Sequence, residues 1–356
     1  MEFQILDSFD PQWLAVLQDL QYDIYHLPSY GQLEAQRTQT TAKAVYIHEG
    51  DRKFFVPYLL RNCLDIAEST EPIFDAVSPY GYPGVLLSEA AKQDDTFLDR
   101  ALDTLKQGFQ THRICSVFLR LNPILNGDFP DIQRSDVFTV SGETVSVDLS
   151  LSEAELWTHT RSGHRSTINK CKRLGFVPRF VPIADYLDEF TTIYEETMAR
   201  VSATQSYYSF NREYFYSMYE ALGDQLHLCI VELEGEAACA GLYTESCGIV
   251  QSTLGGTKDK FVSQSPSTLE TDFARYWAKA RGNQLLHLGG GVGGSHDSVY
   301  RFKAGFSRLS HRFLTLRMIT DPDLYHHLVQ HRARSLKIEP EALSQSQFFP
   351  AYRASA

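Results

Sequence analysis

The sequence predicts a mixed α/β (α+β) fold built from two units of similar construction, and three observations carry that prediction. Short apolar runs with the period of strands alternate with segments of helical period along the 356-residue chain. Three successive strands near residues 226–254 are separated by turn residues, which indicates a contiguous antiparallel sheet. The two halves also repeat a similar order of elements. We therefore expect domains at 1–142 and 143–319, with a C-terminal helix and loose tail at 320–356.

Composition excludes several classes of protein. The chain holds 33 Lys and Arg against 44 Asp and Glu, which gives a formal net charge of −11. This balance argues against general nucleic-acid binding and against DNA as a partner. The hydrophobic fraction of 43% is enough for a sizeable core. We therefore expect an acidic globular protein whose basic residues serve at most a local site.

Cysteine usage and the N-terminal residues indicate a cytoplasmic protein. The six cysteines are scattered, lack CxxC spacing and mostly lie in apolar runs, as free thiols do in a reducing compartment. The opening MEFQILDSFDPQW has neither a basic region nor a long apolar core, so we expect no signal peptide. No apolar run approaches the ~18 residues of a membrane-spanning helix, so we expect no membrane span.

The first half alternates strands with two helices. Helices are expected over 10–20 and 95–110, and strands over 3–6, 42–48, 54–60 and 114–121. Between them, the segment DAVSPYGYPG holds Tyr80 and Tyr82 in one Pro- and Gly-rich turn. Tyrosine presents a flat apolar face and a hydroxyl, so this turn predicts one wall of a binding site. The alternative is a tightly packed loop that covers a sheet edge.

A basic segment opens the second half, after a strand over 145–149 and a helix start at Ser152. Residues 156–184 contain no acidic side chain, although they contain six Lys or Arg residues. In a helix, Arg161, Arg165 and Lys172 would share a stripe about 40° wide. Guanidinium groups match phosphate oxygens geometrically, so Arg161 and Arg165 predict a phosphate-binding site. The alternative is a solvated basic helix face.

The remaining elements complete a second layered unit. We expect a strand over 176–181, helices over 186–199 and 212–222, and then the three-stranded meander. Ser265-Pro266 predicts a helix start, with Ser265 as the cap and Pro266 in the first turn. The amides of Ser267 and Thr268 would then form an anion site at the end of this helix.

Residues 285–307, LLHLGGGVGGSHDSVYRFKAGFS, carry the strongest functional signal. A short buried strand is followed by five glycines within six positions, including Gly290 and Gly291, and then by a helix capped by Ser295 or Asp297. On that helix Lys303 points close to an apolar stripe, where an ammonium group is costly unless it has a partner or a role. The segment predicts a phosphate-sized loop beside a functional lysine. The alternative is a flexible loop before an ordinary surface helix.

The tail offers one further candidate. His327 and His331 are spaced i, i+4, as two metal ligands on a helix can be. No third ligand is evident in the sequence. We therefore expect a solvated helix face there and no metal site in the chain.

Five segments, taken together, resemble the Fem-type (FemABX-like) aminoacyl and peptidyl transferases and the BioF2-like acetyltransferase branch of the GNAT superfamily. Their order and spacing agree over about residues 20–318, and the last segment is the most specific. The segments are HLPSYGQLEA (26–35), DAVSPYGYPG (75–84), RSGHRSTINKCKRLG (161–175), SPSTLETDFARYWAKARG (265–282) and LHLGGGVGGSHDSVYRFKAGFS (286–307).

The resemblance implies two tandem GNAT-like domains with a cleft between them, and transfer of an activated acyl or aminoacyl group to an amine. Lys303 matches the family lysine that contacts the reacting acyl centre. Arg161 and Arg165 match basic residues that bind acceptor phosphates. The further substrate-binding residues are Tyr80, Tyr82, Tyr243 and Tyr300. The donor-binding residues are Ser265, Ser267, Thr268, Gly290 and Gly291.

The donor stays open between acyl-CoA and aminoacyl-tRNA, and no intrinsic cofactor is expected. Residues 161–175 are too short for the long helical arm that cell-wall Fem enzymes use with tRNA. The usual GNAT pyrophosphate loop is also absent before Ser265. We therefore carry three hypotheses: an N-acyltransferase acting on a cell-wall, polysaccharide or other small-molecule or nucleotide-linked amine, an acyl-CoA-dependent acetyltransferase acting on a small amine, and a ligand-binding module without catalysis.

Overall fold

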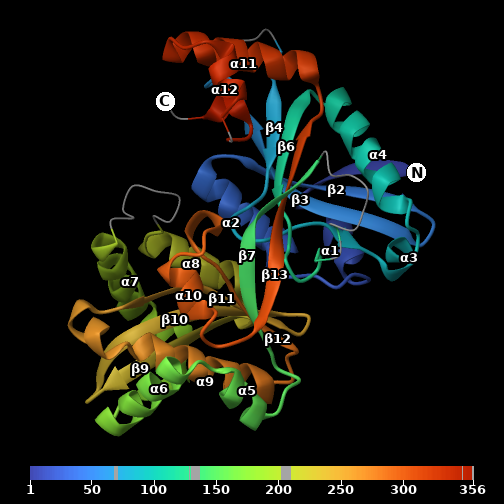
Figure 1. The fold of residues 1–356 in the computed structure, drawn as a ribbon. Coiled ribbons are helices and arrows are strands. Elements are labelled where there is room, and N and C mark those ends of the chain that lie inside the picture. Colours follow the sequence, from blue (N-terminus) through green and yellow to red (C-terminus); the bar gives the residue numbers. More distant parts are fainter. Residues whose placement is uncertain (68–70, 128, 130–136, 202–209, 347, 355–356) are drawn as a thin grey trace. The chain divides into compact units, whose positions relative to one another are not determined.

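The computed structural model divides the chain into two compact units (Figure 1). Unit 1 comprises Met1–Ser141 and Phe313–Ala356, and unit 2 comprises Gly142–Arg312. The predicted mixed α/β class is confirmed. The residues that the structure describes are 1–67, 71–127, 129, 137–201, 210–346 and 348–354.

The division differs from the predicted one at the C-terminal end. The first boundary lies within one residue of the predicted position, but residues 313–319 belong to unit 1 and not to the second domain. The predicted loose tail is also packed, since α11 (Pro322–Leu336) and α12 (Pro340–Ser344) bury apolar side chains in unit 1. Leu328 and Val329 are at most 2% exposed there. Their burial explains why this segment is ordered.

Unit 1 is built on a sheet whose strand order is β1-β2-β3-β4-β6-β13, with β5 paired to β3. The predicted hairpin is confirmed, because β2 and β3 pair antiparallel along their length and turn at Gly50 with a positive φ of 59°. The elements are β1 (Glu2–Asp7), α1 (Pro11–Leu17), α2 (Pro28–Thr38), β2 (Thr41–Glu49), β3 (Arg52–Asn62), β4 (Phe74–Val77), β5 (Leu86–Leu87), α3 (Glu89–Lys92), α4 (Phe97–Thr111), β6 (Ile114–Arg120) and β13 (Leu309–Ile319).

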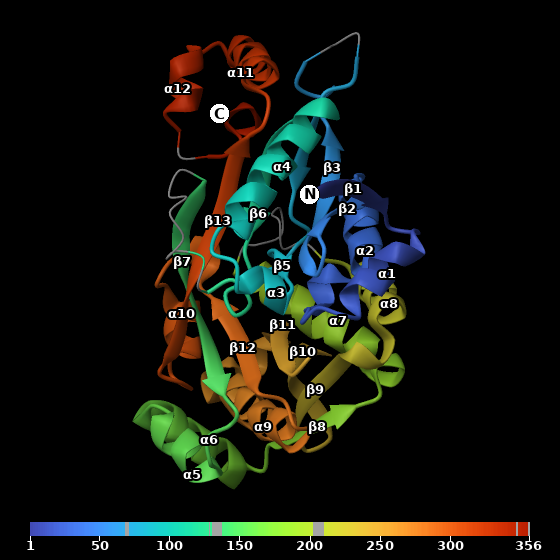
Figure 2. The same ribbon diagram turned by 90° about the vertical axis from the view of Figure 1, so that its right-hand side faces the viewer.

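Two helices cover the two faces of this sheet. Helix α4 packs on one face, since Leu98, Leu102, Leu105 and Phe109 recur at helical spacing and join the main core cluster (Figure 2). Helix α2 packs on the opposite face, where Ala35 joins Ala42 of β2 and Leu59 of β3 in a small apolar cluster. The period-two alternation of β2 and β3 supplies apolar side chains to both faces.

Unit 2 has the strand order β7-β12-β11-β10-β9-β8. The predicted antiparallel meander is confirmed by the pairing of β9, β10 and β11. The capping box of Ser152 and Glu155 is confirmed as well. The elements are β7 (Phe138–Asp148), α5 (Glu153–His159), α6 (Ser162–Leu174), β8 (Val177–Val181), α7 (Ile183–Arg200), α8 (Arg212–Leu222), β9 (Leu226–Leu233), β10 (Glu236–Ser246), β11 (Ile249–Thr257), α9 (Pro266–Ala280), β12 (Leu285–Gly290) and α10 (Ser298–Lys303).

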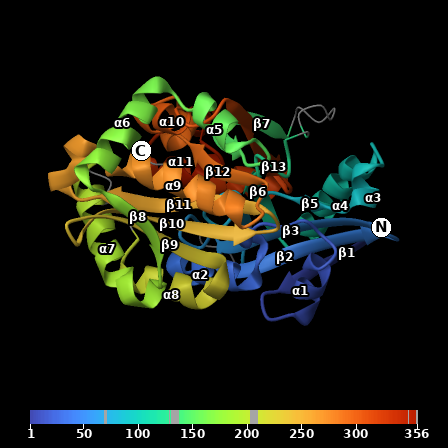
Figure 3. The same cartoon turned by 90° about the horizontal axis from the view of Figure 1, so that it is seen from below.

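Helices also cover both faces of the unit 2 sheet. Figure 3 shows α5, α6 and α9 on one side of strands β8–β11 and α7 on the other. The core beneath α9 joins Ala274 and Ala278 to alternate residues of β7 and β12. Helix α7 approaches β11 so closely that a Cβ added at Gly256 would lie 2.7 Å from the carbonyl oxygen of Ile193. Glycine at this position is therefore a packing requirement.

Candidate active site

The candidate site is centred where two parallel strands of unit 2 separate. Strands β11 and β12 pair only over Ile249–Gln251 and Leu285–His287. Beyond these residues β11 continues to Thr257 against β10, and β12 continues to Gly290 against β7. The two diverging strands therefore present backbone N–H and C=O groups that do not pair with each other. Such an opening beside a helix start is suited to an extended ligand.

The glycine-rich loop after β12 is closed by Asp297. One oxygen of Asp297 accepts from the amide of Tyr300 at 2.9 Å and caps α10, as predicted for this residue. The other accepts from the amide of Val292 at 3.1 Å. A Cβ added at Gly291 would lie 2.0 Å from the carbonyl oxygen of Ser295. Only glycine fits inside this turn.

Gly290 is confined in the same way, which changes the interpretation of the glycines. Gly290 lies within β12, and a Cβ there would be 2.6 Å from the carbonyl oxygen of Glu143 on β7. Gly289 has a positive φ of 78°. The chain itself fills the space at Gly290 and Gly291. Close backbone packing therefore explains these two residues, and the geometry does not support their predicted role as a phosphate cradle.

Lys303 lies at the end of α10 and points back to the glycines. Its Nζ donates to the carbonyl oxygen of Gly290 at 2.7 Å. Burial lowers the pKa of Lys303 to about 8, against an opposing effect of Asp297. The half-buried ammonium group is therefore held by a backbone dipole in surroundings that disfavour its charge, as the amphipathic pattern of α10 predicted.

The two predicted phosphate-binding arginines lie at the start of α6. The predicted helix is confirmed as α6 (Ser162–Leu174), and Arg161 occupies its N-cap position. Arg161 is exposed, and Arg165 is half-buried with one weak bond to the carbonyl oxygen of Trp157 at 3.4 Å. Within the part of the chain that the structure describes, neither guanidinium forms an ion pair. Both charges are therefore available to an anion.

The same helix contacts the Lys303 helix through its first turn. The amide of Arg161 donates to the carbonyl oxygen of Gly305 at 2.8 Å. His164, which is 7% exposed, bonds to the carbonyl oxygen of Phe302 at 2.8 Å. The start of α6, which carries Arg161, therefore docks on the C-terminal end of the Lys303 helix within unit 2.

Helix α9 begins at Pro266, as predicted, but Ser265 does not cap it in the expected way. Ser265 adopts a left-handed conformation with φ 55°, and its side chain makes no capping bond to the helix. Ser267 is half-buried and Thr268 is 3% exposed. The first turn holds no acidic residue that would occupy the positive end of the helix dipole. An anion site at these amides stays a prediction.

The four predicted tyrosines lie in different surroundings. In unit 2, Tyr300 donates to Glu143 at 2.8 Å and stacks on His296 with ring centroids 4.1 Å apart. Burial, then the bond to Glu143, raises the pKa of Tyr300 to about 12. Tyr243 is 1% exposed within the core beneath α9 and interacts with Glu270. Tyr243 is thus a core residue in the structure, because its ring points from β10 under α9, and not a residue of an open wall.

Tyr80 and Tyr82 lie in unit 1 on a firmly held turn. The amide of Tyr80 donates to Glu34 at 3.2 Å, and its carbonyl oxygen accepts from Tyr30 at 3.0 Å. Tyr82 is half-buried and packs edge-on against Phe313 with centroids 5.1 Å apart. The turn also has φ 93° at Gly81. Both tyrosines are therefore positioned by backbone contacts, and their role in binding stays a prediction.

A row of buried polar side chains beside Lys303 was not predicted. Ser146, His287, Gln251 and Thr244 are register partners on β7, β12, β11 and β10, and each is at most 2% exposed. His287 Nδ1 lies 2.5 Å from Gln251 Oε1, so Nδ1 carries the hydrogen. Burial, with smaller effects of His311 and Lys303, lowers the pKa of His287 to about 3. The alternation in LLHL could have placed His287 opposite its leucine neighbours, on this face.

Helix α9 carries a second buried group that sequence reasoning missed. Glu270 is 6% exposed, and its Oε1 has no hydrogen-bond partner among the residues that the structure describes. Burial raises the pKa of Glu270 to about 7, although Tyr243 and Thr271 oppose the effect. A Cβ added at Gly241 would lie 2.4 Å from Glu270 Oε1, so glycine on β10 makes room for this carboxyl group.

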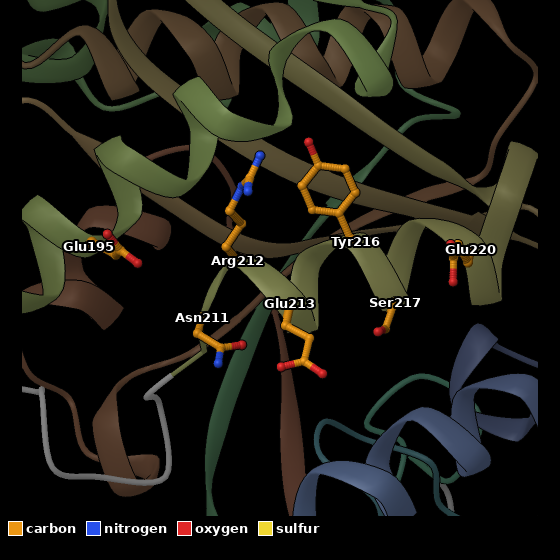
Figure 4. Close-up of a pocket in the computed structure, with 7 residues that line it drawn as sticks. All are labelled: Glu195, Asn211, Arg212, Glu213, Tyr216, Ser217 and Glu220. Carbon is orange, nitrogen blue, oxygen red and sulfur yellow. The ribbon is translucent and has the colours of Figure 1, made fainter.

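A separate surface pocket contains none of the predicted residues. It lies over α8 and the C-terminal half of α7 (Figure 4), and Arg212 and Tyr216 point to one side of α8 while Glu213 and Ser217 point to the other. Arg212 pairs with Asp188 at 2.6 Å. Paired and exposed charges of this kind do not suggest chemistry. The lining residues are Glu195, Asn211, Arg212, Glu213, Tyr216, Ser217 and Glu220.

The described residues offer neither a metal site nor a membrane-spanning helix. They contain no group of three or more His, Cys, Asp or Glu residues placed to hold a metal ion. The rings of His327 and His331 are tilted against each other at 51°, with centroids 4.5 Å apart. Among the same residues, no helix combines the length and apolar character needed to cross a bilayer.

Comparison with known proteins gives matches among solved structures only. No family model and no curated protein matches the sequence. The crystal structure of FemX superposes with a TM-score of 0.68 at 12% identity, covering 92% of this chain and 99% of that one. A conserved protein of unknown function from Bacteroides thetaiotaomicron gives 0.51 at 12% identity, over 82% of this chain and 90% of that one.

A third match is the C-terminal domain of a proposed lysylphosphatidylglycerol synthetase from Agrobacterium fabrum. Its TM-score is 0.50 at 12% identity, over 83% of this chain and 88% of that one. At such identities the likeness concerns the fold. The chain therefore shares its two-unit fold with FemX, whose family its sequence segments resemble.

Proposed function

We propose that this protein is an N-acyltransferase that moves an activated acyl or aminoacyl group to an amine. The observation that carries the proposal is Lys303, whose half-buried ammonium group is held by the carbonyl oxygen of Gly290 beside the opening between β11 and β12. Desolvation of this ammonium group lowers the stability of the fold, and charged groups in such surroundings are often functional. The FemX-like fold is consistent with acyl transfer.

The chemistry follows from the charge that develops in acyl transfer. The acceptor nitrogen attacks the acyl carbon and the carbonyl oxygen becomes an oxyanion. The carbonyl group then re-forms as the bond to the thiolate or ribose oxygen of the donor breaks, and this leaving group takes the proton that the nitrogen loses. Two N–H bonds of the Lys303 ammonium group remain after the bond to Gly290, and one would bind the oxyanion. A donor of this kind contributes typically ~3 kcal/mol of transition-state stabilisation.

The proposed acceptor carries phosphate or another anionic group. Arg161 and Arg165 supply two guanidinium groups outside any ion pair of the described residues, and α6 docks on the Lys303 helix. A nucleotide-linked or small-molecule amine, such as a cell-wall or polysaccharide precursor, would place its phosphates there and its amine near Lys303. Such precursors are made in the cytoplasm, where we propose the protein acts.

The donor is acyl-CoA or aminoacyl-tRNA, and each has support in the geometry. The diverging edges of β11 and β12 suit the amide groups of a pantetheine arm, and the first turn of α9 suits its pyrophosphate. The resemblance of the sequence segments to Fem-type aminoacyl transferases favours an aminoacyl donor. Acyl-CoA would give the second candidate, an acetyltransferase acting on a small amine.

One assay separates these donors and tests the proposal. The protein is incubated with an amine-bearing nucleotide-sugar peptide or a small diamine, and with either acetyl-CoA or charged bulk tRNA, with and without ribonuclease. Mass spectrometry should detect a product heavier by one acyl group. Loss of that product on ribonuclease treatment identifies tRNA, and persistence identifies CoA. Binding of donor without product across the panel would instead indicate a ligand-binding module.

A further inference from the structure

The Lys303 helix is too short to fix its own position. Helix α10 spans six residues, and isolated helices of this length are not stable in water. Its N-terminal end is held by Asp297, which caps Tyr300 and closes the glycine loop. At its C-terminal end, the carbonyl oxygen of Phe302 accepts from the amide of Gly305 at 3.0 Å, and its second lone pair has a partner from elsewhere in the chain.

His164 of α6 is that partner. Its Nε2 lies 2.8 Å from the carbonyl oxygen of Phe302, the residue directly before Lys303. A carbonyl oxygen only accepts, so Nε2 carries the hydrogen. Nδ1 then accepts from Nη2 of Arg161 at 3.3 Å. The neutral imidazole thus links the arginine on one side to the backbone of the lysine helix on the other.

Packing around the imidazole explains the FKAGF sequence at the end of α10. The ring contacts Phe302 and Phe306, with centroids 5.3 and 4.6 Å apart. A Cβ added at Gly305 would lie 2.4 Å from His164 Nε2. Three residues of this pentapeptide therefore form the seat of His164, while Lys303 points toward Gly290.

The surroundings of His164 keep its imidazole neutral. Burial lowers the pKa of His164, Arg161 lowers it further, and the bond to Phe302 opposes both. A second proton on Nδ1 would face the guanidinium group of Arg161. The two bonds of His164, to Arg161 and to Phe302, therefore require a neutral imidazole and use both of its nitrogens.

We propose that His164 is a positioning residue that places Lys303 for acyl transfer and couples it to Arg161 at the anion site. The inference deepens the proposed function, because it takes Lys303 as the group that acts on the substrate. Without the bond to Phe302, the end of α10 is free to move away from Gly290. Lys303 then becomes hydrated and loses its buried position.

The test measures how Lys303 titrates, which requires no substrate. Trace labelling with acetic anhydride at a series of pH values, followed by peptide mass spectrometry, gives the midpoint at which Lys303 becomes nucleophilic. The wild type should titrate near 8. In His164→Phe, which keeps an aromatic ring but neither bond, the midpoint should rise by roughly one pH unit or more toward the ordinary ~10.4.

Three further variants make the result decisive. His164→Gln restores a donor toward Phe302 and should keep the wild-type midpoint. Gly305→Ala displaces the imidazole from its seat and should reproduce the shift, even if His164→Phe does not fold. His159→Phe, on the neighbouring helix α5, is the matched control and should change nothing.

A wild-type midpoint in folded His164→Phe and Gly305→Ala would overturn the inference, even if both variants lose thermal stability. Failure of the proposed function has a different signature. In that case the midpoint would shift as expected, while the wild type would transfer no acyl group from any donor.

Discussion

Lys303 is a charged side chain in surroundings that favour its neutral form, which lowers the free energy of unfolding. We predict that Lys303→Met raises the free energy of unfolding by about 1 kcal/mol, because an apolar chain of similar length replaces a buried charge. Chemical denaturation measures the change. Lys170→Met, at an exposed position of α6, serves as the control and should stay within about 0.5 kcal/mol of wild type.

The same variant should show a dependence on pH whose sign is fixed. The native state holds the Lys303 proton less tightly than the unfolded chain does, so wild-type stability should rise as pH increases from about 8 toward ~10.4. The advantage of the methionine variant should therefore be largest below pH 8 and shrink above it. An advantage independent of pH from 7 to 10 would show that Lys303 is not desolvated.

Catalysis should depend on pH in the opposite sense. If the charged form stabilises the oxyanion, kcat/KM should fall as pH rises through about 8, because Lys303 then loses its proton. Lys303→Arg, which stays charged, should lack this alkaline limb even if its rate is low. A rate that keeps rising from pH 8 to 9.5 in the wild type would instead assign Lys303 the role of a base.

Lys303 and Arg161 could be found from the sequence, but the roles of His164 and His287 could not. The stripe on 299–306 shows an ammonium group against apolar surface, which is visible in one helix. His164 is placed by a contact with Phe302, which lies 138 residues away in sequence. His287 is placed by the register of β12 against β11. Tyr243 was misplaced for the same reason, since alternation along β10 does not say which helix covers each face.

At the scale of elements, the glycines divide into those where an added Cβ would clash with neighbouring atoms and those where it would meet nothing. Gly291→Ala should lower activity and stability together, because its Cβ would meet the carbonyl oxygen of Ser295 at 2.0 Å. Gly163→Ala should instead stabilise α6 by about 0.5–1 kcal/mol, since nothing lies within 4 Å of an added Cβ there. Thermal unfolding of the two variants should therefore move in opposite directions.

Periodicity predicted the elements well and their ends less well. The hairpin of β2 and β3, the meander β9–β11 and helices α4, α8 and α9 all appear where apolar spacing placed them. The prediction that the Ser265 side chain caps α9 was wrong, because this residue adopts a left-handed conformation that the sequence pattern does not reveal. Composition alone predicts an open, phosphate-binding loop at the glycine run. It cannot distinguish a loop that binds a ligand from a segment whose backbone packs against another backbone.

At the scale of the molecule, the C-terminal segment should matter for the stability of unit 1. Arg353 donates to Asp75 at 2.7 Å, and Asp75 also accepts from Arg61 at 2.6 Å while fully buried. Arg353→Ala should lower the free energy of unfolding by about 1–3 kcal/mol, because a buried carboxylate loses one of its partners. Arg334→Ala on α11, near the same segment, is the control. Equal stabilities would contradict the packed tail.

The domain order of the chain explains why the tail was misjudged. The chain leaves unit 1 through β7 and returns to it through β13, so a division into consecutive segments places residues 313–319 in the second domain and treats 320–356 as a separate tail. Local patterns such as the i, i+3, i+4 spacing of α11 predict a helix but not the surface that it covers. Two α/β units with strands flanked by helices were nevertheless predicted from the order of the elements.

The most direct measurement is the single-turnover rate of acyl transfer by Lys303→Ala relative to wild type, with donor saturating and circular dichroism confirming the fold. Loss of the Lys303 ammonium group, which donates to Gly290 of β12, should slow the chemical step by at least about 100-fold, with little change in donor affinity. A folded alanine variant that transfers at the wild-type rate would show that Lys303 takes no part in the reaction.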